Sequence, residues 1–505
     1  KVLLRISNLK QYFPLKGGRF VKANDGITLD IYEGETFGLV GESGCGKSTL
    51  GRTILQLYHQ TYGRTMYYGR SLDDLAPKYV IDTVKNLKAR RTKLRELEQK
   101  RDKLEADYAK LSEKEQYAKH GELDTARKLA EDALLDITKI VGGFLVVDDL
   151  DPVIAAYSKD YAIARKLSGM EEKRQELQVD VDDAEYAKKT AEEAGKSGKD
   201  DQLQKAQEKL KQCDDQIAAL RSQLDAGRKE IEALRAPYAN DPEFQKYEAY
   251  RDDGIDLARL EYNEMRRLRR DMQLIFQDPY SSLNPRMSVG QIISEGMQAH
   301  NMIKKKDARM QEMVLKIMDD CGLAPYFLHR FPHQFSGGQR QRIGIARALA
   351  TKPKFVVCDE AVSALDVSIQ AQIINLLLDL KEQQNLTYMF ITHDLSVVKY
   401  ISDRVGVMYL GTMVELAAAD EIFHHPIHPY TEALLNAIPT TDTVGAKELS
   451  ILEGDIPSPV NPPKGCKFHT RCKYCTEICT QVVPEWEEVR PNHFVACHHK
   501  LEAKE

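Results

Sequence analysis

A chain of 505 residues is long enough for two or three domains, each with a core of its own. Its 72 basic and 77 acidic residues leave a formal net charge of −5, which excludes a global field that would draw the chain to nucleic acid or to an anionic membrane. No run of 18 apolar residues is present, and the first residues lack the features of a signal peptide, so we expect a cytosolic protein.

Residues 1–77 alternate apolar and polar positions in short runs such as "ITLDIY" and "TFGLVG", which predicts an α/β domain. Between an expected strand and an expected helix, "GESGCGKST" (Gly41 to Thr49) fits the pattern G-x-x-x-x-G-K-[ST]. In such a loop the backbone N–H groups of residues 44–48 cradle phosphates. Lys47 would then reach the β- and γ-phosphates, and Ser48 would bind Mg²⁺.

Residues 78–260 are rich in Lys, Glu, Asp, Ala and Leu, and they predict a helical coiled-coil insertion. In Asp201 to Arg235, apolar residues recur every seven positions with a second set three residues later: Leu203, Leu210, Ile217, Leu224 and Ile231, then Ala206, Cys213, Leu220, Gly227 and Leu234. The segment "GKSGKD" (Gly195 to Asp200) predicts the turn of an antiparallel hairpin. The apolar patch at 141–157 is interpreted as a hinge or a docking tip.

Mixed α/β patterning resumes after this insertion and continues to about residue 425. Within it, "KFVVCDE" (Lys354 to Glu360) is an apolar strand that ends in two acids. Asp359 is a candidate Mg²⁺ ligand, and Glu360 is a candidate base that polarises water. A proline-marked extension follows at 426–505, where five of the nine cysteines crowd the end of the chain. That crowding predicts a metal or cluster site.

The motifs "GESGCGKST", "LIFQDP", "FSGGQRQRIGIARAL", "CDEAVSALD" and "FITHDL" occur in this order, and together they resemble the ATP-binding-cassette (ABC) ATPase family. The resemblance implies ATP as substrate, Mg²⁺ bound by Ser48, Gln277 and Asp359, and a catalytic group of Lys47, Gln277, Glu360 and His393. Other ATP contacts would be Phe13 or its neighbour Tyr12 under adenine, and Gly41, Ser43, Gly44, Cys45, Gly46 and Thr49 around the phosphates. Ser336, Gly337, Gly338 and Gln339 would cap the ATP of the opposite subunit, and Ser363, Ala364, Leu365 and Asp366 would line the subunit contact.

The segments "QLIFQDPYSSLNPRMSVGQII", "FPHQFSGGQRQRIGIARAL" and "LEGDIPSPVNPPKGCKFHTRC" resemble more closely the F-type ATP-binding subunit of oligopeptide/dipeptide importers. This implies a second ATPase subunit, favoured to be a related D-type chain, two transmembrane permeases and an extracytoplasmic peptide-binding protein. The chain would then lie peripherally on the cytoplasmic face of the inner membrane. The sequence departs from the family at Ala361, where proline is commoner, and at the insertion.

In this importer family a cysteine tail is associated with a [4Fe-4S] cluster, and the resemblance implies Cys466, Cys472, Cys479 and Cys497 as its ligands. A structural zinc site is the alternative, with Cys472, Cys475, Cys479 and one further ligand such as Cys497 or a histidine. Unligated reduced thiols are a third reading.

The expected architecture is an α/β ABC-type P-loop ATPase domain at 1–77 and 261–425, interrupted by the coiled-coil insertion at 78–260 and followed by the small Cys-rich extension at 426–505. Two other functions compete with an importer motor. Chromosome-maintenance or DNA-repair ATPases also split a cassette with a coil, but their coil follows the "LIFQDP" motif, whereas here it precedes it. A ribosome-bound factor would need two cassettes in one chain. We therefore expect no nucleic-acid partner.

Overall fold

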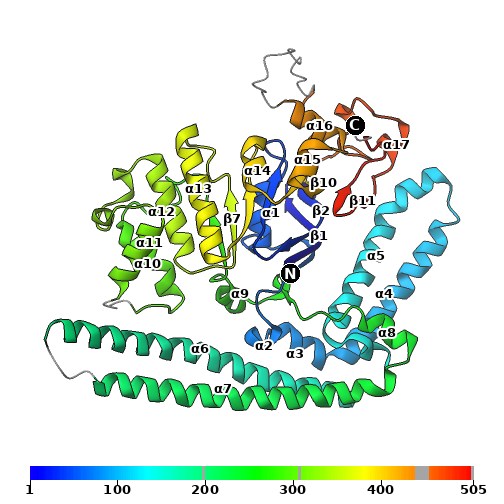
Figure 1. Ribbon diagram of the computed structural model, residues 1–505. Coiled ribbons are helices and arrows are strands. Elements are labelled where there is room, and N and C mark those ends of the chain that lie inside the picture. The colour runs from blue at the N-terminus through cyan, green and yellow to red at the C-terminus, as the bar shows by residue number, and fades with distance from the viewer. Residues whose placement is uncertain (196–199, 305–308, 438–453, 502–505) are drawn as a thin grey trace. The chain divides into compact units, whose positions relative to one another are not determined.

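The computed structural model describes residues 1–195, 200–304, 309–437 and 454–501 (Figure 1). The chain divides into two compact units. Unit 1 comprises residues 1–69 and 265–505, and unit 2 comprises residues 70–264. Among the described residues, no helix has the length and apolar character needed to cross a membrane.

Two sheets form the framework of unit 1. In the first sheet, β1 (Val2–Pro14) lies between β2 (Phe20–Tyr32) and β4 (Tyr62–Tyr67) and pairs antiparallel with both. The second sheet has eight strands in the described part of the chain, in the order β11-β12-β10-β9-β3-β8-β7-β6. They are β3 (Thr36–Val40), β6 (Met272–Ile275), β7 (Phe355–Asp359), β8 (Thr387–Ile391), β9 (Arg404–Tyr409), β10 (Thr412–Ala418), β11 (Glu487–Arg490) and β12 (His493–Val495).

The centre of the second sheet is parallel, and its three middle strands are buried along their whole length. β3 pairs parallel with β8 and β9, and β7 pairs parallel with β6 and β8. Every residue of β3, β7 and β8 is buried, as expected when helices cover a parallel sheet, so these strands read as apolar runs. This architecture confirms the predicted mixed α/β P-loop fold.

The helices of unit 1 follow the strands in chain order. They are α1 (Lys47–Ile54), α10 (Val289–Ala299), α11 (Met310–Asp320), α12 (Gly337–Leu349), α13 (Val367–Gln384), α14 (Leu395–Ile401), α15 (Ala419–His424), α16 (Pro429–Asn436) and α17 (Glu477–Gln481), with 3₁₀ turns at Pro325–Phe327, Pro332–Gln334 and His469–Arg471. The helix α9 (Tyr262–Leu268) spans the boundary between the two units.

Unit 2 is built mainly of helices. They are α2 (Leu72–Leu75), α3 (Lys78–Lys85), α4 (Leu87–Tyr108), α5 (Glu113–Val141), α6 (Asp151–Glu193), α7 (Asp200–Arg235) and α8 (Pro242–Glu248), with 3₁₀ turns at Gly142–Val146, Ala236–Tyr238 and Leu257–Arg259 and the short strand β5 (Ile255–Asp256).

Helices α6 and α7 lie side by side (Figure 1), and the buried face of α7 recurs at heptad spacing. Cys213, Ile217 and Leu224 pack against Ala164 and Leu167 of α6 in one apolar cluster. Ion pairs flank this cluster, among them Lys159 with Glu230 at 2.7 Å and Arg174 with Asp214 at 2.6 Å. The predicted turn at 195–200 falls largely on residues 196–199, which lie outside the described residues.

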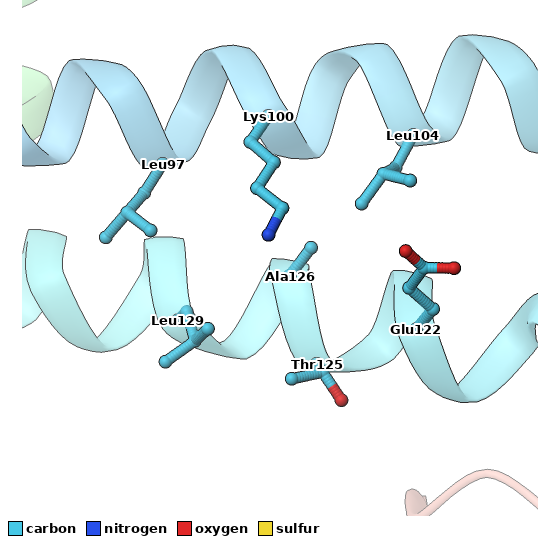
Figure 2. A pocket seen from close by; sticks show the side chains of 7 residues that line it. All are labelled: Leu97, Lys100, Leu104, Glu122, Thr125, Ala126 and Leu129. Atoms are coloured by element: carbon cyan, nitrogen blue, oxygen red, sulfur yellow. The ribbon is translucent and has the colours of Figure 1, made fainter.

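The apolar patch at 141–157 is not a docking tip, because its large side chains are buried inside unit 2. Phe144 is fully buried and contacts the rings of Tyr157 and Phe244 edge to face. Elsewhere in unit 2, α4 and α5 enclose a cavity of about 180 Å³ between their facing sides (Figure 2). Leu97 and Leu104 line it from α4, and Ala126 and Leu129 line it from α5.

Candidate active site

The glycine-rich loop closes tightly around the start of α1. Gly46 precedes the helix with φ 102°, and a Cβ atom there would lie 2.1 Å from the Ala23 carbonyl oxygen, so only glycine fits. The Lys47 ammonium donates to the carbonyl oxygens of Gly41 at 2.7 Å and Glu42 at 3.0 Å. The loop therefore places N–H groups at a helix N-terminus together with a fixed cation, which is the arrangement that binds a phosphate chain.

Two of the predicted Mg²⁺ ligands meet where β7 ends beside α1. The Ser48 hydroxyl donates to Asp359 Oδ1 at 2.5 Å, and Arg52 Nη2 donates to Asp359 Oδ2 at 3.1 Å. Asp359 has no exposed surface, so its carboxylate is held in place by these contacts. A hydroxyl and a carboxylate side by side are the hard oxygen donors that Mg²⁺ prefers, so these residues fit the predicted ion.

Glu360 lies at the entrance of the same site in a strained backbone conformation. Its φ is 47°, and its N–H donates to the Ile391 carbonyl oxygen of β8 at 2.9 Å. Gln277 Nε2 donates to Glu360 Oε2 at 2.6 Å, and His393 Nδ1 lies 3.6 Å from Glu360 Oε1. A left-handed non-glycine residue is costly and persists where its surroundings hold it, and such residues cluster at active sites.

Part of this set lines one cavity of about 370 Å³ in unit 1, whereas Gly41, Asp359 and His393 lie outside the lining. Residues 43–49, Gln277 and Glu360 line it together with Phe13. Tyr12, the other candidate for contact with adenine, instead donates its hydroxyl to Asp25 at 2.5 Å. Of the two aromatic candidates, Phe13 lines the cavity and Tyr12 does not.

The Ser336 to Gln339 segment does not line this cavity. Ser336 caps α12, because its hydroxyl accepts from Gln339 N at 3.4 Å while Gln339 Oε1 accepts from Ser336 N at 3.1 Å. A Cβ atom on Gly337 would lie 3.5 Å from a Leu365 methyl group, so this segment adjoins the 363–366 segment. Ser336 and Gly337 are exposed, which leaves this helix N-terminus open to a ligand from outside the chain.

Several cavity residues were missed by sequence reasoning. Val21, Lys22 and Ala23 of β2, the turn at Leu410 and Gly411, and Pro459 of the C-terminal extension all line it. Lys22 N also donates to the Pro459 carbonyl oxygen at 3.1 Å. No local sequence pattern predicts these contacts, because the residues of β2 are hundreds of positions away from residues 410, 411 and 459 in the chain.

The extension also contacts the glycine-rich loop directly, through Glu42. Arg471 donates to the Glu42 carboxylate through both terminal nitrogens, at 2.7 and 3.0 Å. The Tyr430 hydroxyl accepts from Glu42 N at 2.9 Å.

A second contact of the extension affects Asp25 of β2. Burial acts to raise the pKa of Asp25, but the charges of Lys467 and Lys10 and the hydrogen bond from the Tyr12 hydroxyl outweigh burial and lower that pKa.

The predicted cluster ligands lie near one another in the extension. Cys466 N donates to the Cys479 carbonyl oxygen at 2.8 Å, and the charges of Cys466, Cys472 and Cys479 each act to raise the pKa of Cys497. Burial raises the pKa of Cys466 to about 11 and that of Cys497 to about 12. Four neighbouring thiols have the chemistry of a cluster site. Their sulfurs are not gathered around a common point, since the described residues contain no group of three or more His, Cys, Asp or Glu placed to hold a metal ion.

The model of the family described as "ABC transporter" matches residues 24–245 and 245–363, more than half of the chain. The chain belongs to the ABC transporter family. A second model, "Oligopeptide/dipeptide transporter, C-terminal region", matches residues 414–479 of this ABC protein.

Two Bacillus subtilis relatives and one Brucella relative illustrate the similarity. The putative oligopeptide transport ATP-binding protein YkfD is 34% identical over 498 residues, covering 98% of this chain and 95% of the relative. The oligopeptide transport ATP-binding protein AppF is 52% identical over 250 residues, covering 48% of this chain and 75% of the relative. A putative peptide import ATP-binding protein of Brucella ovis is 54% identical over 245 residues, covering 48% of this chain and 77% of the relative.

Proposed function

We propose that this ABC protein is the ATP-hydrolysing subunit of a membrane importer for oligopeptides or dipeptides. The observation that carries the ATPase assignment is the contact of Glu360 with Gln277 and His393, because Glu360 and Gln277 line the same cavity as the glycine-rich loop. The names of the relatives and the peptide-transporter match at residues 414–479 support the substrate class.

The proposed mechanism assigns a role to each residue of the site. The loop N–H groups and Lys47 would hold the β- and γ-phosphates of ATP, and Ser48 with Asp359 would hold Mg²⁺, which would supply positive charge to the phosphates. Glu360 takes a proton from the attacking water, Gln277 orients that water and Mg²⁺, and His393 contacts the γ-phosphate. The contact of Gln277 and His393 with Glu360 supports this division of roles.

The site would be completed by a second ATPase subunit. Ser336 to Gln339 lie at an exposed helix N-terminus outside the cavity, which supports a role in capping ATP bound by the partner, with residues 363–366 at the contact. We infer a related D-type chain as partner and two transmembrane permeases. A peripheral location on the cytoplasmic face of the inner membrane follows from this assembly, and an extracytoplasmic protein would deliver the peptide.

A Glu360→Gln substitution tests the assignment. The amide cannot accept a proton, so we expect ATP to remain bound while hydrolysis slows by about 10²- to 10⁴-fold. Turnover should be measured in the assembled transporter with the partner's site inactivated, and Glu382→Gln, on the exposed side of α13, is the matched control. Undiminished hydrolysis by Glu360→Gln would remove Glu360 from the mechanism.

We propose further that Cys466, Cys472, Cys479 and Cys497 bind a [4Fe-4S] cluster that cross-links the extension. The backbone hydrogen bond that joins Cys466 N to the Cys479 carbonyl oxygen at 2.8 Å supports this assignment, because it brings two of the four residues side by side. Protein purified without oxygen should contain iron and sulfide, and Cys475→Ser should retain both. One zinc per chain without iron, lost in Cys475→Ser, would establish the alternative zinc site instead.

For the rest of the chain we propose the division into an ABC domain (1–77 and 261–425), an insertion (78–260) and an extension (426–505). The heptad burial of α7 against α6 supports an antiparallel coiled coil as the main element of the insertion.

A further inference from the structure

The short segment Cys466 to Cys472 of the extension carries three side chains that hold it to other parts of unit 1. Lys467 Nζ donates to the Leu410 carbonyl oxygen at 3.1 Å and lies 3.3 Å from Asp25 Oδ2. The Phe468 ring is almost fully buried against Tyr409 and Tyr430, with ring centroids 5.2 Å apart in both pairs. The third side chain, Arg471, reaches the glycine-rich loop.

Arg471 engages Glu42 with little solvent between them. Its side chain is 4% exposed, and the Glu42 side chain is 23% exposed. Arg471 Nη1 donates to Glu42 Oε2 at 2.7 Å, and Arg471 Nη2 donates to Glu42 Oε1 at 3.0 Å. The pair therefore has two parallel hydrogen bonds, a geometry that gives strong, directional binding. Lysine at position 471 could not reproduce the two parallel bonds.

Glu42 connects Arg471 to Lys47, the lysine of the glycine-rich loop. Its carboxylate meets Arg471, its N–H donates to the Tyr430 hydroxyl at 2.9 Å, and its carbonyl oxygen accepts from Lys47 Nζ at 3.0 Å. The carbonyl oxygen also accepts from Cys45 N at 3.3 Å, so every polar group of Glu42 is engaged, and its carboxylate and its N–H are both held by residues beyond position 425. The loop that holds phosphate is fixed from outside by the C-terminal part of the chain.

We infer that Arg471 is a positioning residue of the nucleotide site, and that the extension forms part of that site by holding Glu42. The inference rests on the proposed binding of ATP to the loop. Freeing Glu42 lets the loop adopt other conformations, and nucleotide binding then has to restore the competent one. A site that is only fractionally populated binds with an affinity reduced by that fraction.

A double-mutant cycle in the full-length chain tests this, with dissociation constants for ATP and ADP measured calorimetrically in the presence of Mg²⁺. We expect Arg471→Gln and Glu42→Gln each to raise both constants about five- to tenfold, and the double variant to do no more than either change alone. The matched control is Lys473→Gln, which removes the ion pair between the exposed Lys473 ammonium and Glu432 and should leave both constants unchanged.

Wild-type affinity in Arg471→Gln would overturn the inference, and so would additive effects in the double variant, because Arg471 would then not act through Glu42. If Arg471→Gln does not fold, Arg471→Lys and Glu42→Gln decide in its place, and unchanged constants in both would overturn the inference. Failure of the wild-type chain to bind ATP would instead contradict the proposed function.

Discussion

At the residue scale, the site depends on a few side chains held from several directions. Asp359 is buried and accepts hydrogen bonds from Ser48 and Arg52, one on each carboxylate oxygen, so the carboxylate group cannot rotate freely. The free-energy cost of burying the Asp359 carboxylate is small, because both of its partners donate hydrogen bonds and Arg52 carries a positive charge. The same contacts make Asp359 sensitive to the smallest chemical change, the exchange of one oxygen for an amide nitrogen.

We predict that Asp359→Asn weakens binding of ATP with Mg²⁺ by about tenfold or more, since a neutral amide is a poorer ligand for a hard cation. Binding of ATP with a chelator present should change much less. Calorimetry with and without Mg²⁺ measures the difference, and Asp379→Asn, on an exposed position of α13, is the control. Equal weakening with and without Mg²⁺ would show that Asp359 only supports the fold.

His428 should make stability depend on pH. It is buried and caps α16 by accepting from Tyr430 N at 3.0 Å. Burial lowers its pKa from 6.5 to about 4, and the charge of Glu415 opposes this shift only in part. Between pH 4 and pH 6.5, His428 is therefore protonated in the unfolded chain and neutral in the folded chain. The free energy of unfolding falls as the pH drops from about 6.5 towards 4.

We predict that this group alone costs about 2 kcal/mol between pH 7 and pH 5, and that His428→Asn removes that loss because asparagine also caps but does not titrate. Urea unfolding can be followed through Trp486, which stacks on Phe494 in the same unit. Both proteins share all other titrating groups, so the difference between their two pH slopes is the quantity to compare. Identical slopes would contradict the prediction.

At the element scale, local patterns predicted the helices and the loop well. The heptad residues of α7 are buried or half-buried at every predicted position from Leu203 to Leu234, because spacing alone decides which side of a helix faces its neighbour. The glycine-rich loop was predicted equally well, because its pattern G-x-x-x-x-G-K-[ST] is contained in a few consecutive residues. The contacts of Tyr430 and Arg471 with Glu42, and of Pro459 with Lys22, could not be predicted, because no periodicity relates residues so far apart in the sequence.

We predict that Ile217→Asp separates α6 from α7 near the middle of the pair, because a carboxylate would replace a side chain that is 5% exposed within the apolar cluster. The expected cost is about 3 kcal/mol or more. Ala218→Asp places the same residue on the exposed side of the next position and is the matched control. Hydrogen exchange of the α6 and α7 amides should accelerate in the first variant only.

At the scale of the whole molecule, composition indicated where the helical insertion lies, but it did not reveal how its ends are tied. The Leu75 and Ala76 carbonyl oxygens accept from the Ser168 and Tyr161 hydroxyls at 3.4 and 3.1 Å, so unit 2 includes residues before position 78. These bonds cross more than 80 residues of sequence. Hydroxyl groups at single positions carry no pattern that a sequence reading could use.

The two ends of the insertion lie together within unit 2, which makes its removal a clean test. Lys78 N donates to Glu264 Oε1 at 2.8 Å, and Asp256 N donates to the Tyr79 hydroxyl at 3.1 Å. A short Gly/Ser linker from Lys78 to Asp256 can therefore span the gap that deletion leaves, at little entropic cost.

We predict that the deleted chain folds and binds ATP with the affinity of the parent, because the residues that line the cavity all lie in unit 1. Any defect should appear in assembly with the partner subunits, in regulation or in coupling to transport. Calorimetric ATP binding by the isolated deleted chain and its parent is the measurement, with circular dichroism to establish folding. A folded deletion that no longer binds ATP would show that the insertion helps to build the nucleotide site, and it could not then be an independent insertion in the cassette.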